Sequence, residues 1–217
     1  MPASRTHNLE TLVVEIEETL LRLGVAVTAA VSVSGTPRVI DRTHLVDLDQ
    51  FSPADGDVFI AAAFGPARRA ELISMGQELG MASAPALIDP TAILPRSLRV
   101  GVGTFINAGV VIGGMSIIGE GVLVNRAVSV GHHCMLGNFV SIGPGATLAG
   151  NVHVGEGSVI GAGAVIQPDV RIGSHAVISA GTVVRKQVPD GALVAGNPAV
   201  TKAFKPKRSS LAVEGGE

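Results

Sequence analysis

Residues 154–178 read VGEGSVIGAGAVIQPDVRIGSHAVI, and an aliphatic residue returns at every sixth position of this stretch. Continuing the step of six in both directions extends the repeat to residues 88–189, with a branched aliphatic residue opening every hexad. These residues are Ile88, Leu94, Val100, Ile106, Ile112, Ile118, Val124, Val130, Leu136, Ile142, Leu148, Val154, Ile160, Ile166, Ile172, Ile178 and Val184. We number each hexad from this aliphatic residue, which is position one.

A period of six predicts a coiled β-structure and excludes an amphipathic helix. In a helix of 3.6 residues per turn, residues six positions apart do not share one face, so the apolar stripe would wind around the helix axis. Three hexads can instead close one triangular coil, each hexad forming a short strand and a corner, with the next coil stacked on it. Position one then fills the interior and the small residue at position five fits the corner. We expect the frequent glycines at position two to supply the unusual backbone angles of the turns.

Residues 1–84 lack the repeat and predict a small α/β domain. The expected elements are a helix over 8–23 that Gly24 ends, strands over 25–33 and 57–64, and a helix from Pro66 to Gly80. We expect this domain to cover one end of a β-helix domain over residues 85–199, because an open strand edge recruits other chains. Residues 200–217 are predicted to form a C-terminal tail.

Composition narrows the class of function. The net charge of −2 provides no basic field that would attract nucleic acid or an anionic membrane. No apolar run is long enough to predict a membrane span, and the acidic N-terminal stretch does not resemble a signal peptide. Cys134 is the single cysteine, which favours a reducing compartment. We therefore expect a cytoplasmic protein with neither nucleic acid nor membrane as a partner.

The hexad VGHHCM, residues 130–135, carries the candidate chemistry. His132 stands at position three, at or next to a corner, and one coil of eighteen residues places it between Gly114 and Gly150. Two glycines leave room beside the imidazole for a thioester. An imidazole can accept a proton from an amine or hydroxyl near neutral pH, while backbone N–H groups of the coil stabilise an oxyanion. From the residues alone, a solvated corner histidine without a catalytic role is the favoured interpretation.

The stretch NRAVSVGHHCMLGNFVSIGPGATLAGNVHVGEGSVIGAGAVI over residues 125–166, followed by GNPA at 196–199, resembles a known family. It is similar to the hexapeptide-repeat acyltransferases, in the group of sialic acid O-acetyltransferases and nucleotide-amino-sugar N-acetyltransferases. The resemblance implies a truncated, Rossmann-like α/β domain followed by a left-handed parallel β-helix. It implies acetyl-CoA as co-substrate, a sugar acceptor that is free or nucleotide-linked, and a homotrimer with the active site between subunits.

The resemblance also implies roles for individual residues. His132 matches the general base, and His133 takes the place of the acidic residue that accompanies it, so these two form the expected catalytic set. The expected substrate-binding residues are Asn125, toward the acceptor sugar, and Gly65, toward its nucleotide. The expected acetyl-CoA contacts fall on Ser141, Ala162 and Ala180, where Ser141 replaces a histidine. The glycine-rich nucleotide loop is absent, because no glycine precedes Gly24.

Two other functions stay open at this point. One is a metal-dependent hydratase of the β-helical carbonic anhydrase type, for which His133, His153 and His175 would be the ligands. Their spacing lacks the close pair of that family, so we expect no metal site. The other is a β-helix scaffold that has lost catalysis. Cys134, at position five, is expected to be a small core residue and not a nucleophile.

Overall fold

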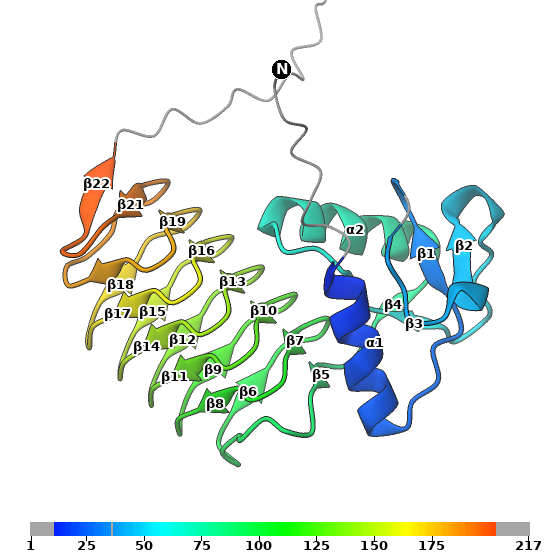
Figure 1. Cartoon of the computed structure of the whole chain (residues 1–217), viewed down its shortest axis with the longest axis horizontal. Helices are drawn as coiled ribbons and strands as arrows, with labels where there is room; N and C mark the ends of the chain where they lie inside the picture. Colours follow the sequence, from blue (N-terminus) through cyan, green and yellow to red (C-terminus); the bar gives the residue numbers. More distant parts are fainter. Residues whose placement is uncertain (1–10, 36, 203–217) are drawn as a thin grey trace, which may run out of the picture.

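The computed structural model describes residues 11–35 and 37–202. Its larger part is a stack of triangular coils whose short parallel strands line up into three sheets (Figure 1). Equivalent strands of successive coils are eighteen residues apart, as in the pairing of Ser129 with Thr147 and of Met135 with His153. This arrangement of parallel sheets is typical of a left-handed β-helix of hexapeptide repeats, which confirms the coiled architecture that the period predicts.

Each sheet forms one face of the stack, and we name each face after a central strand. The β10 face contains β5 (Leu87–Ile88), β7 (Phe105–Ile106), β10 (Leu123–Val124), β13 (Ser141–Ile142), β16 (Val159–Ile160), β19 (Val177–Ile178), β21 (Leu193–Ala195) and β22 (Val200–Lys202). The β11 face contains β8 (Val111–Ile112), β11 (Ser129–Val130), β14 (Thr147–Leu148), β17 (Val165–Ile166) and β20 (Val183–Val184). The β12 face contains β6 (Arg99–Val100), β9 (Ile117–Ile118), β12 (Met135–Leu136), β15 (His153–Val154) and β18 (Arg171–Ile172).

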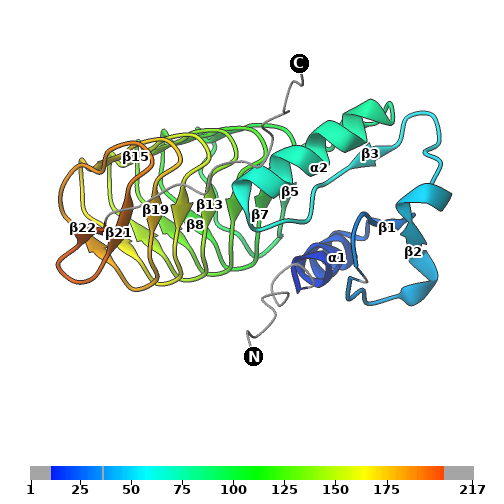
Figure 2. The same cartoon turned by 90° about the horizontal axis from the view of Figure 1, so that it is seen from above.

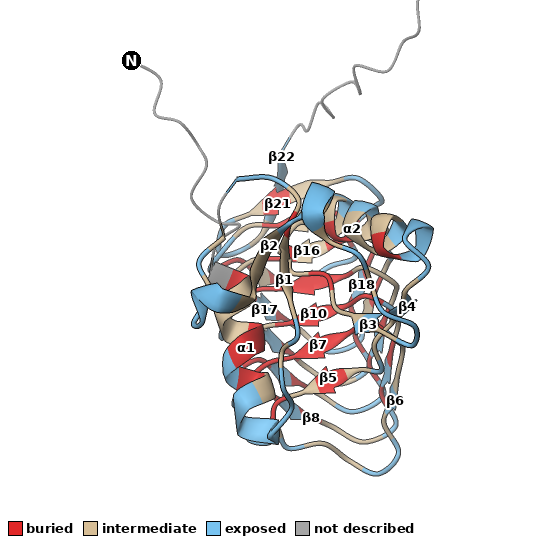
Figure 3. Ribbon diagram, turned by 90° about the vertical axis from the view of Figure 1, so that its right-hand side faces the viewer, coloured by how far each residue is buried: buried red, intermediate tan, exposed pale blue. Residues whose placement is uncertain are grey.

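The interior of the stack is filled as the hexad pattern predicts. Position-one residues such as Ile142 and Ile160 are fully buried, and so are position-five residues such as Val140 and Ala146. Each buried aliphatic side chain contributes roughly 1.5–3 kcal/mol relative to its exposed state. One continuous core therefore runs along the coils, visible as the red strands in Figure 3.

The prediction that the position-two glycines supply the unusual backbone angles of the turns was wrong. The left-handed backbone angles occur at position four, where His133 has φ 57° and Gly145 has φ 66°. At position two the coils approach too closely for a side chain: a Cβ on Gly113 would lie 2.5 Å from the backbone nitrogen of His132. The glycines at position two thus allow the coils to stack closely, and position four makes the turn.

The last coil departs from the period. Val188 pairs with Ile172, a separation of sixteen residues, and Leu193 pairs with Val177 at the same separation. Val188 is buried and takes the inward place of a position-one residue, which the regular period would have assigned to residue 190. Strand β22 then folds back antiparallel to β21 and becomes the outer strand of the β10 face. Of the predicted tail, residues 203–217 lie outside the described residues.

The N-terminal part contains both predicted helices. They are α1 (Thr11–Leu23) and α2 (Pro66–Glu78), and the glycines that follow them, Gly24 and Gly80, have φ 69° and 83°. This part also contains two separate pairs of parallel strands. They are β1 (Ala30–Ser32) with β2 (Leu45–Asp47), and β3 (Val58–Phe59) with β4 (Ala82–Ser83). Two short 3-10 helices flank β2, at Arg42–His44 and Leu48–Gln50. The first residues of the predicted helix over 8–23, residues 8–10, lie outside the described residues.

These elements lie over the outer side of the β10 face, beside its first strands (Figure 2). Leu12 and Ile16 of α1 form a second, smaller core with Leu87, Phe105 and Leu123 of three neighbouring strands. The three strand residues alternate with the inward aliphatics of the stack, so they point outward. The β10 face is consequently covered, while the other two faces have no such cover among the described residues.

A buried arginine joins helix α2 to the stack. Arg69 is only 2% exposed, and its guanidinium donates to the carbonyl oxygens of Ala63 at 2.7 Å and Phe64 at 3.0 Å in its own segment. It also donates to three carbonyls of the coils, Gly121 at 2.6 Å, Phe139 at 2.8 Å and Val140 at 3.0 Å. Burial lowers the pKa of Arg69 to about 10, so the group stays charged at neutral pH.

A buried carboxylate joins helix α1 to the first coil. Asp89 is fully buried and accepts from Thr19 at 2.8 Å and from Arg22 at 2.8 Å, both of α1. It also accepts from the Thr91 backbone and hydroxyl at 2.9 and 2.6 Å. Desolvation raises the pKa of Asp89, but the hydrogen bonds from Thr91, Thr19 and Arg22 outweigh it and lower the pKa to about 2.

Stability is expected to depend on this carboxylate at acid pH. The folded pKa lies below the unfolded value of 3.8, so the contribution, about 2 kcal/mol, is complete above pH 4 and disappears as the pH falls through 2. Urea unfolding of the protein and of Asp89→Asn over pH 2–7 measures it. We expect the stability difference to shrink between pH 4 and pH 2. An equal difference at every pH would contradict the assignment.

Candidate active site

His132 and His133 lie together at the corner between strands β11 and β12. Both side chains are exposed, and their Nδ1 atoms are 3.0 Å apart. The rings meet edge to face, with centroids 5.1 Å apart and an interplanar angle of 85°. The left-handed backbone of His133 brings its ring back toward the preceding residue. The structure therefore places a hydrogen-bond partner beside His132 at the position where the resembled family has a carboxylate.

The contact between the two Nδ1 atoms restricts the protonation of the pair. One ring must carry a proton on Nδ1 and the other must leave that nitrogen bare. When His132 is the donor, its Nε2 is bare and can accept a proton, which is the form that a general base needs. When His132 becomes an imidazolium it still donates to His133, and a neutral acceptor stabilises that charge less than a carboxylate would.

The imidazole of His132 leans over Gly150 in the next coil. A Cβ on Gly150 would lie 2.7 Å from Cε1 and 2.8 Å from Nε2 of His132. On the other side, a Cβ on Gly114 would meet only Ser97 Oγ, at 3.6 Å. The two flanking glycines are thus not equivalent, and Nε2 faces the coil that follows His132 in the sequence.

Gly150→Ala is expected to lower kcat by about tenfold to a hundredfold, because the added methyl group must displace the imidazole from its position. The backbone at Gly150 does not have a left-handed φ, so alanine should fold normally there. Steady-state kinetics with circular dichroism measure both effects. Gly114→Ala is the matched comparison, and a loss of kcat as large as that of Gly150→Ala would contradict the orientation described.

The backbone and the cysteine around the histidine pair are held within the coils. The amide of Gly131 donates to Leu148 O at 2.7 Å, and the amide of His133 donates to Gly114 O at 2.9 Å. Cys134 is fully buried and its thiol donates to Ala149 O at 3.2 Å. Burial raises the pKa of this thiol, which agrees with the prediction of a core residue and disfavours a thiolate nucleophile.

Asn125, Ala162 and Ala180 share another corner, the one between the β10 and β11 faces. Asn125 follows β10, and its side-chain oxygen accepts from the amide of Arg126 at 2.8 Å and from Asn107 at 3.3 Å. The same corner lies beside helix α1, since Arg126 forms an ion pair with Glu15. Ala162 and Ala180 are one coil apart, with Ala162 O accepting from Gly181.

Ser141 and Gly65 meet at the junction of the N-terminal segment with the stack. The hydroxyl of Ser141 is fully buried and donates to Phe64 O at 2.6 Å. Gly65 is the N-cap residue of α2, and the space around its Cα is open. The side chain of Ser141 is therefore occupied in holding the segment that precedes α2, on a face that does not border the His132 corner.

The predicted site residues thus fall into separate groups within one chain. The expected catalytic pair, His132 and His133, lies at the corner between the β11 and β12 faces, whereas Asn125 and the two alanines lie at the corner between the β10 and β11 faces. The whole width of the β11 face separates the two corners. One chain alone does not bring its expected base and its expected acceptor contact together.

The histidines considered as metal ligands do not converge. His133 is at one corner, His153 is on β15, and His175 is at the corner after the β12 face. Over residues 11–35 and 37–202, no group of three or more histidine, cysteine, aspartate or glutamate side chains could hold a metal ion.

Comparisons with known proteins place the chain in a family. A family model described as bacterial transferase hexapeptide (six repeats) matches residues 151–186. The acetyltransferase domain of PglB from Neisseria gonorrhoeae, solved with acetyl coenzyme A, is 30% identical, with a TM-score of 0.69 over 87% of this chain and 93% of that one. The chain belongs to the hexapeptide-repeat sugar acetyltransferases.

Two further solved structures resemble this sugar acetyltransferase. Perosamine N-acetyltransferase from Caulobacter crescentus, solved with CoA and GDP-perosamine, is 28% identical with a TM-score of 0.74, covering 88% of this chain and 91% of that one. That structure carries a histidine-to-asparagine substitution, and a companion structure has the histidine changed to alanine. WeeI from Acinetobacter baumannii is 27% identical with a TM-score of 0.78, covering 87% and 93%. A search of curated proteins found no match.

Sequence reasoning missed two features of this sugar acetyltransferase. Arg69, inside α2, carries no sequence signal of burial, because an arginine in a helix is ordinarily exposed. The other is a contact on the β12 face between Arg171 and His153, which stand eighteen residues apart at position six of their hexads. The repeat could have paired them, since equal positions one coil apart are neighbours.

No helix of the described residues is long and apolar enough to cross a membrane.

Proposed function

We propose that the protein transfers the acetyl group of acetyl-CoA to an amine or hydroxyl of a sugar, with His132 as the general base. The observation that carries this proposal is the exposed His132–His133 pair, in which the two Nδ1 atoms are in contact and His132 Nε2 faces Gly150. Acetyl-CoA is supported by the PglB domain, which was solved with that molecule and is 30% identical over nearly the whole chain.

In the proposed reaction, His132 Nε2 accepts the proton of the acceptor amine or hydroxyl as its nitrogen or oxygen attacks the thioester carbonyl. A tetrahedral oxyanion forms, the C–S bond breaks, and CoA leaves as a thiolate that takes up the proton. His133 holds the His132 ring in place through Nδ1 during this step. General-base catalysis of this kind contributes about 10²–10⁴-fold.

The acceptor is proposed to be a sugar that is free or nucleotide-linked. The N-terminal residues 1–84 are interpreted as a truncated, Rossmann-like acceptor-binding domain, whose helix α2 begins next to Gly65. The perosamine N-acetyltransferase that the chain resembles was solved with GDP-perosamine, a nucleotide-linked amino sugar. Asn125 is the proposed contact to the sugar itself.

We propose a homotrimer with the active site between protomers. The two groups of site residues lie on opposite edges of the β11 face, so one protomer can supply His132 and its neighbour Asn125, Ala162 and Ala180. The uncovered β11 face, whose outward residues include Val111 and Val165, is a suitable contact surface. Ala162 and Ala180 would contact acetyl-CoA through their backbone, while Ser141 contributes by fixing Phe64. The cytoplasm stays the predicted location, because a single buried thiol suits a reducing compartment.

A panel of nucleotide-linked amino sugars and free sugars, assayed for CoA release with a thiol reagent, tests the function. Turnover with at least one acceptor supports acetyl transfer, and mass spectrometry of the product distinguishes N- from O-acetylation. A protein that binds acetyl-CoA with none of the panel turned over would favour the scaffold alternative. Stoichiometric zinc together with CO₂ hydration would favour the hydratase and contradict acetyl transfer.

A further inference from the structure

A column of polar side chains runs along the corner between the β10 and β11 faces. Position two of a hexad is often glycine, but in three successive coils it is Asp89, Asn107 and Asn125, and Gly143 follows in the next coil. Helix α1 packs on the same coils, beside β5 and β7 (Figure 3). Asp89 and Asn107 are fully buried, whereas Asn125 is half-buried, so the column reaches the surface at Asn125.

The middle member of the column, Asn107, is held in one orientation. Its Oδ1 accepts from the amide of Ala108 at 2.7 Å, and its Nδ2 lies 3.4 Å from Glu15 Oε2 and 3.3 Å from Asn125 Oδ1. A backbone amide can only donate and an ionised carboxylate can only accept. The side-chain amide of Asn107 therefore cannot flip without losing its contacts to Ala108 and Glu15, and it must donate to Asn125.

Asn125 is oriented in turn by two donors. Its Oδ1 accepts from Asn107 at 3.3 Å and from the amide of Arg126 at 2.8 Å, which leaves its Nδ2 on the other side of the amide carbon. Within residues 11–35 and 37–202, this Nδ2 has no hydrogen-bond partner. Because no buried side-chain nitrogen or oxygen in those residues lacks a partner, the Nδ2 atom is accessible to solvent.

The carboxylate of Glu15, on helix α1, is fixed at both oxygens. One oxygen faces Asn107 and the other forms the ion pair with Arg126. The Glu15 side chain is 24% exposed and that of Arg126 is 53% exposed. Because Arg126 balances the charge of Glu15, what Glu15 contributes at Asn125 is orientation and not a free negative charge.

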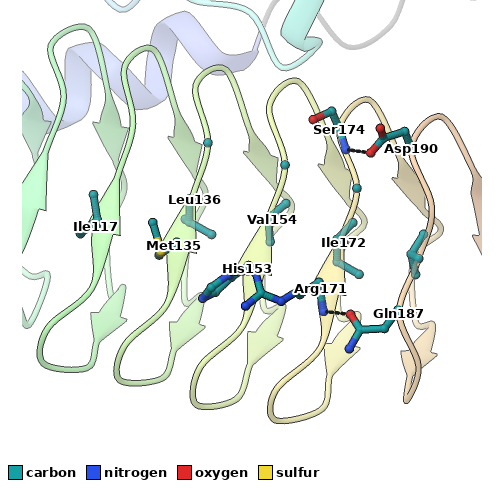
Figure 4. A pocket seen from close by; sticks show the side chains of 14 residues that line it. Ile117, Met135, Leu136, His153, Val154, Arg171, Ile172, Ser174, Gln187 and Asp190 are labelled. Carbon is teal, nitrogen blue, oxygen red and sulfur yellow. Dashed lines mark hydrogen bonds between the residues drawn. The ribbon is translucent and has the colours of Figure 1, made fainter.

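Polar side chains elsewhere in the stack join adjacent coils in a single step. Asp190 Oδ1 accepts from the amide of Ser174 at 2.7 Å (Figure 4), and Asn151 Nδ2 donates to Asp169 at 2.8 Å. The connection from Glu15 to Asn125 differs from these contacts. It begins on a helix of the N-terminal part, passes through one fully buried amide and ends at an accessible donor.

We propose that Glu15 and Asn107 are positioning residues for the acceptor. They hold the side-chain amide of Asn125 so that its Nδ2 donates a hydrogen bond to an oxygen of the sugar. This inference rests on the proposed function, in which Asn125 contacts the acceptor. The group recognised is an oxygen with a free lone pair, and an ammonium group at the same place is disfavoured because it would face another N–H donor. Helix α1 thereby becomes part of the sugar site.

Steady-state kinetics with the fastest acceptor of the sugar panel test the assignment. Glu15→Ala releases the amide of Asn107, and the KM for the acceptor should rise about tenfold because one oriented hydrogen bond is lost. The kcat and the KM for acetyl-CoA should stay within about twofold of the parent values. Glu15→Gln keeps an oxygen for Asn107 and loses only an exposed ion pair, so its acceptor KM should stay within about threefold of the parent value.

Glu18→Ala is the matched control, because Glu18 lies on the same helix and also pairs with an arginine, Arg22, at 3.4 Å. We expect it to have the parent kinetics. Glu15→Ala combined with Asn107→Ala should raise the acceptor KM no further than Asn107→Ala alone, because Glu15 acts only through Asn107. An unchanged acceptor KM in Glu15→Ala, an equal rise in Glu18→Ala, or effects of the two substitutions that multiply would each overturn the inference.

Crystal structures of the parent protein and of Glu15→Ala give a second readout that needs no acceptor. The Asn125 side chain should be well ordered in the parent protein and should show alternate conformers or raised B-factors in the variant. An equally ordered Asn125 in both would overturn the inference while leaving the proposed function intact. A parent protein that turns over none of the panel would instead contradict the proposed function, and the two crystal structures would still decide whether Glu15 orients Asn125.

Discussion

Replacing His132 by alanine is expected to lower kcat for acetyl transfer by about 10²–10⁴-fold, with little change in the KM for acetyl-CoA. The reason is that Nε2 of this ring faces Gly150 and is the proposed proton acceptor. The ring is solvent-exposed and outside the aliphatic core, so its removal should not lower stability. The measurement is CoA release with a competent acceptor, together with the thermal midpoint.

His175→Asn is the matched control for this experiment. His175 is also an exposed corner histidine, and asparagine tolerates its left-handed φ of 54°. We expect this variant to retain the parent activity. Unchanged turnover in His132→Ala would exclude the proposed base, and a comparable loss in both variants would point to a general disturbance of the coils.

Replacing Arg69 by methionine is expected to destabilise the protein by about 3–5 kcal/mol. Methionine fills a similar volume but leaves five carbonyl oxygens without the buried charge that they surround. For a chain of this length the thermal midpoint should fall by roughly 10 °C. Because Arg69 joins α2 to the coils, we expect the N-terminal segment to become cleavable by protease at temperatures where the coils persist.

The comparison for Arg69 is its neighbour Arg68. That side chain is half-buried and pairs with Glu71 at 3.0 Å one helical turn away, a contact of small stabilising effect. Arg68→Met should leave the midpoint within about 2 °C of the parent value. Equal midpoints for the two variants would show that the buried hydrogen bonds of Arg69 contribute little.

The β-helix could be predicted from the sequence because one rule repeats along it. The inward residue of each hexad, Ile142 for example, has to be aliphatic wherever the coil is triangular, and the period of six states this directly. The same rule misled us about glycine. Sequence alone cannot separate a glycine that turns the chain, such as Gly145, from one that only lets coils approach, such as Gly113.

The site could be predicted only in part, because its contacts join elements that no sequence pattern links. The position of His132 next to Gly150 follows from the eighteen-residue coil and was predicted. The bond between the Nδ1 atoms of His132 and His133 was not, since it depends on a left-handed backbone angle at His133. The burial of Ser141 under Phe64 depends on how the N-terminal segment folds over the β10 face, which the repeat does not encode.

Before the last coil, every coil of the stack has eighteen residues. Each coil advances the stack by one strand spacing, about 4.8 Å, so equivalent positions on different coils are separated along the axis by a multiple of that step. Duplication or deletion of a whole coil would lengthen or shorten the stack by that step, while residues away from the changed coil keep their neighbours.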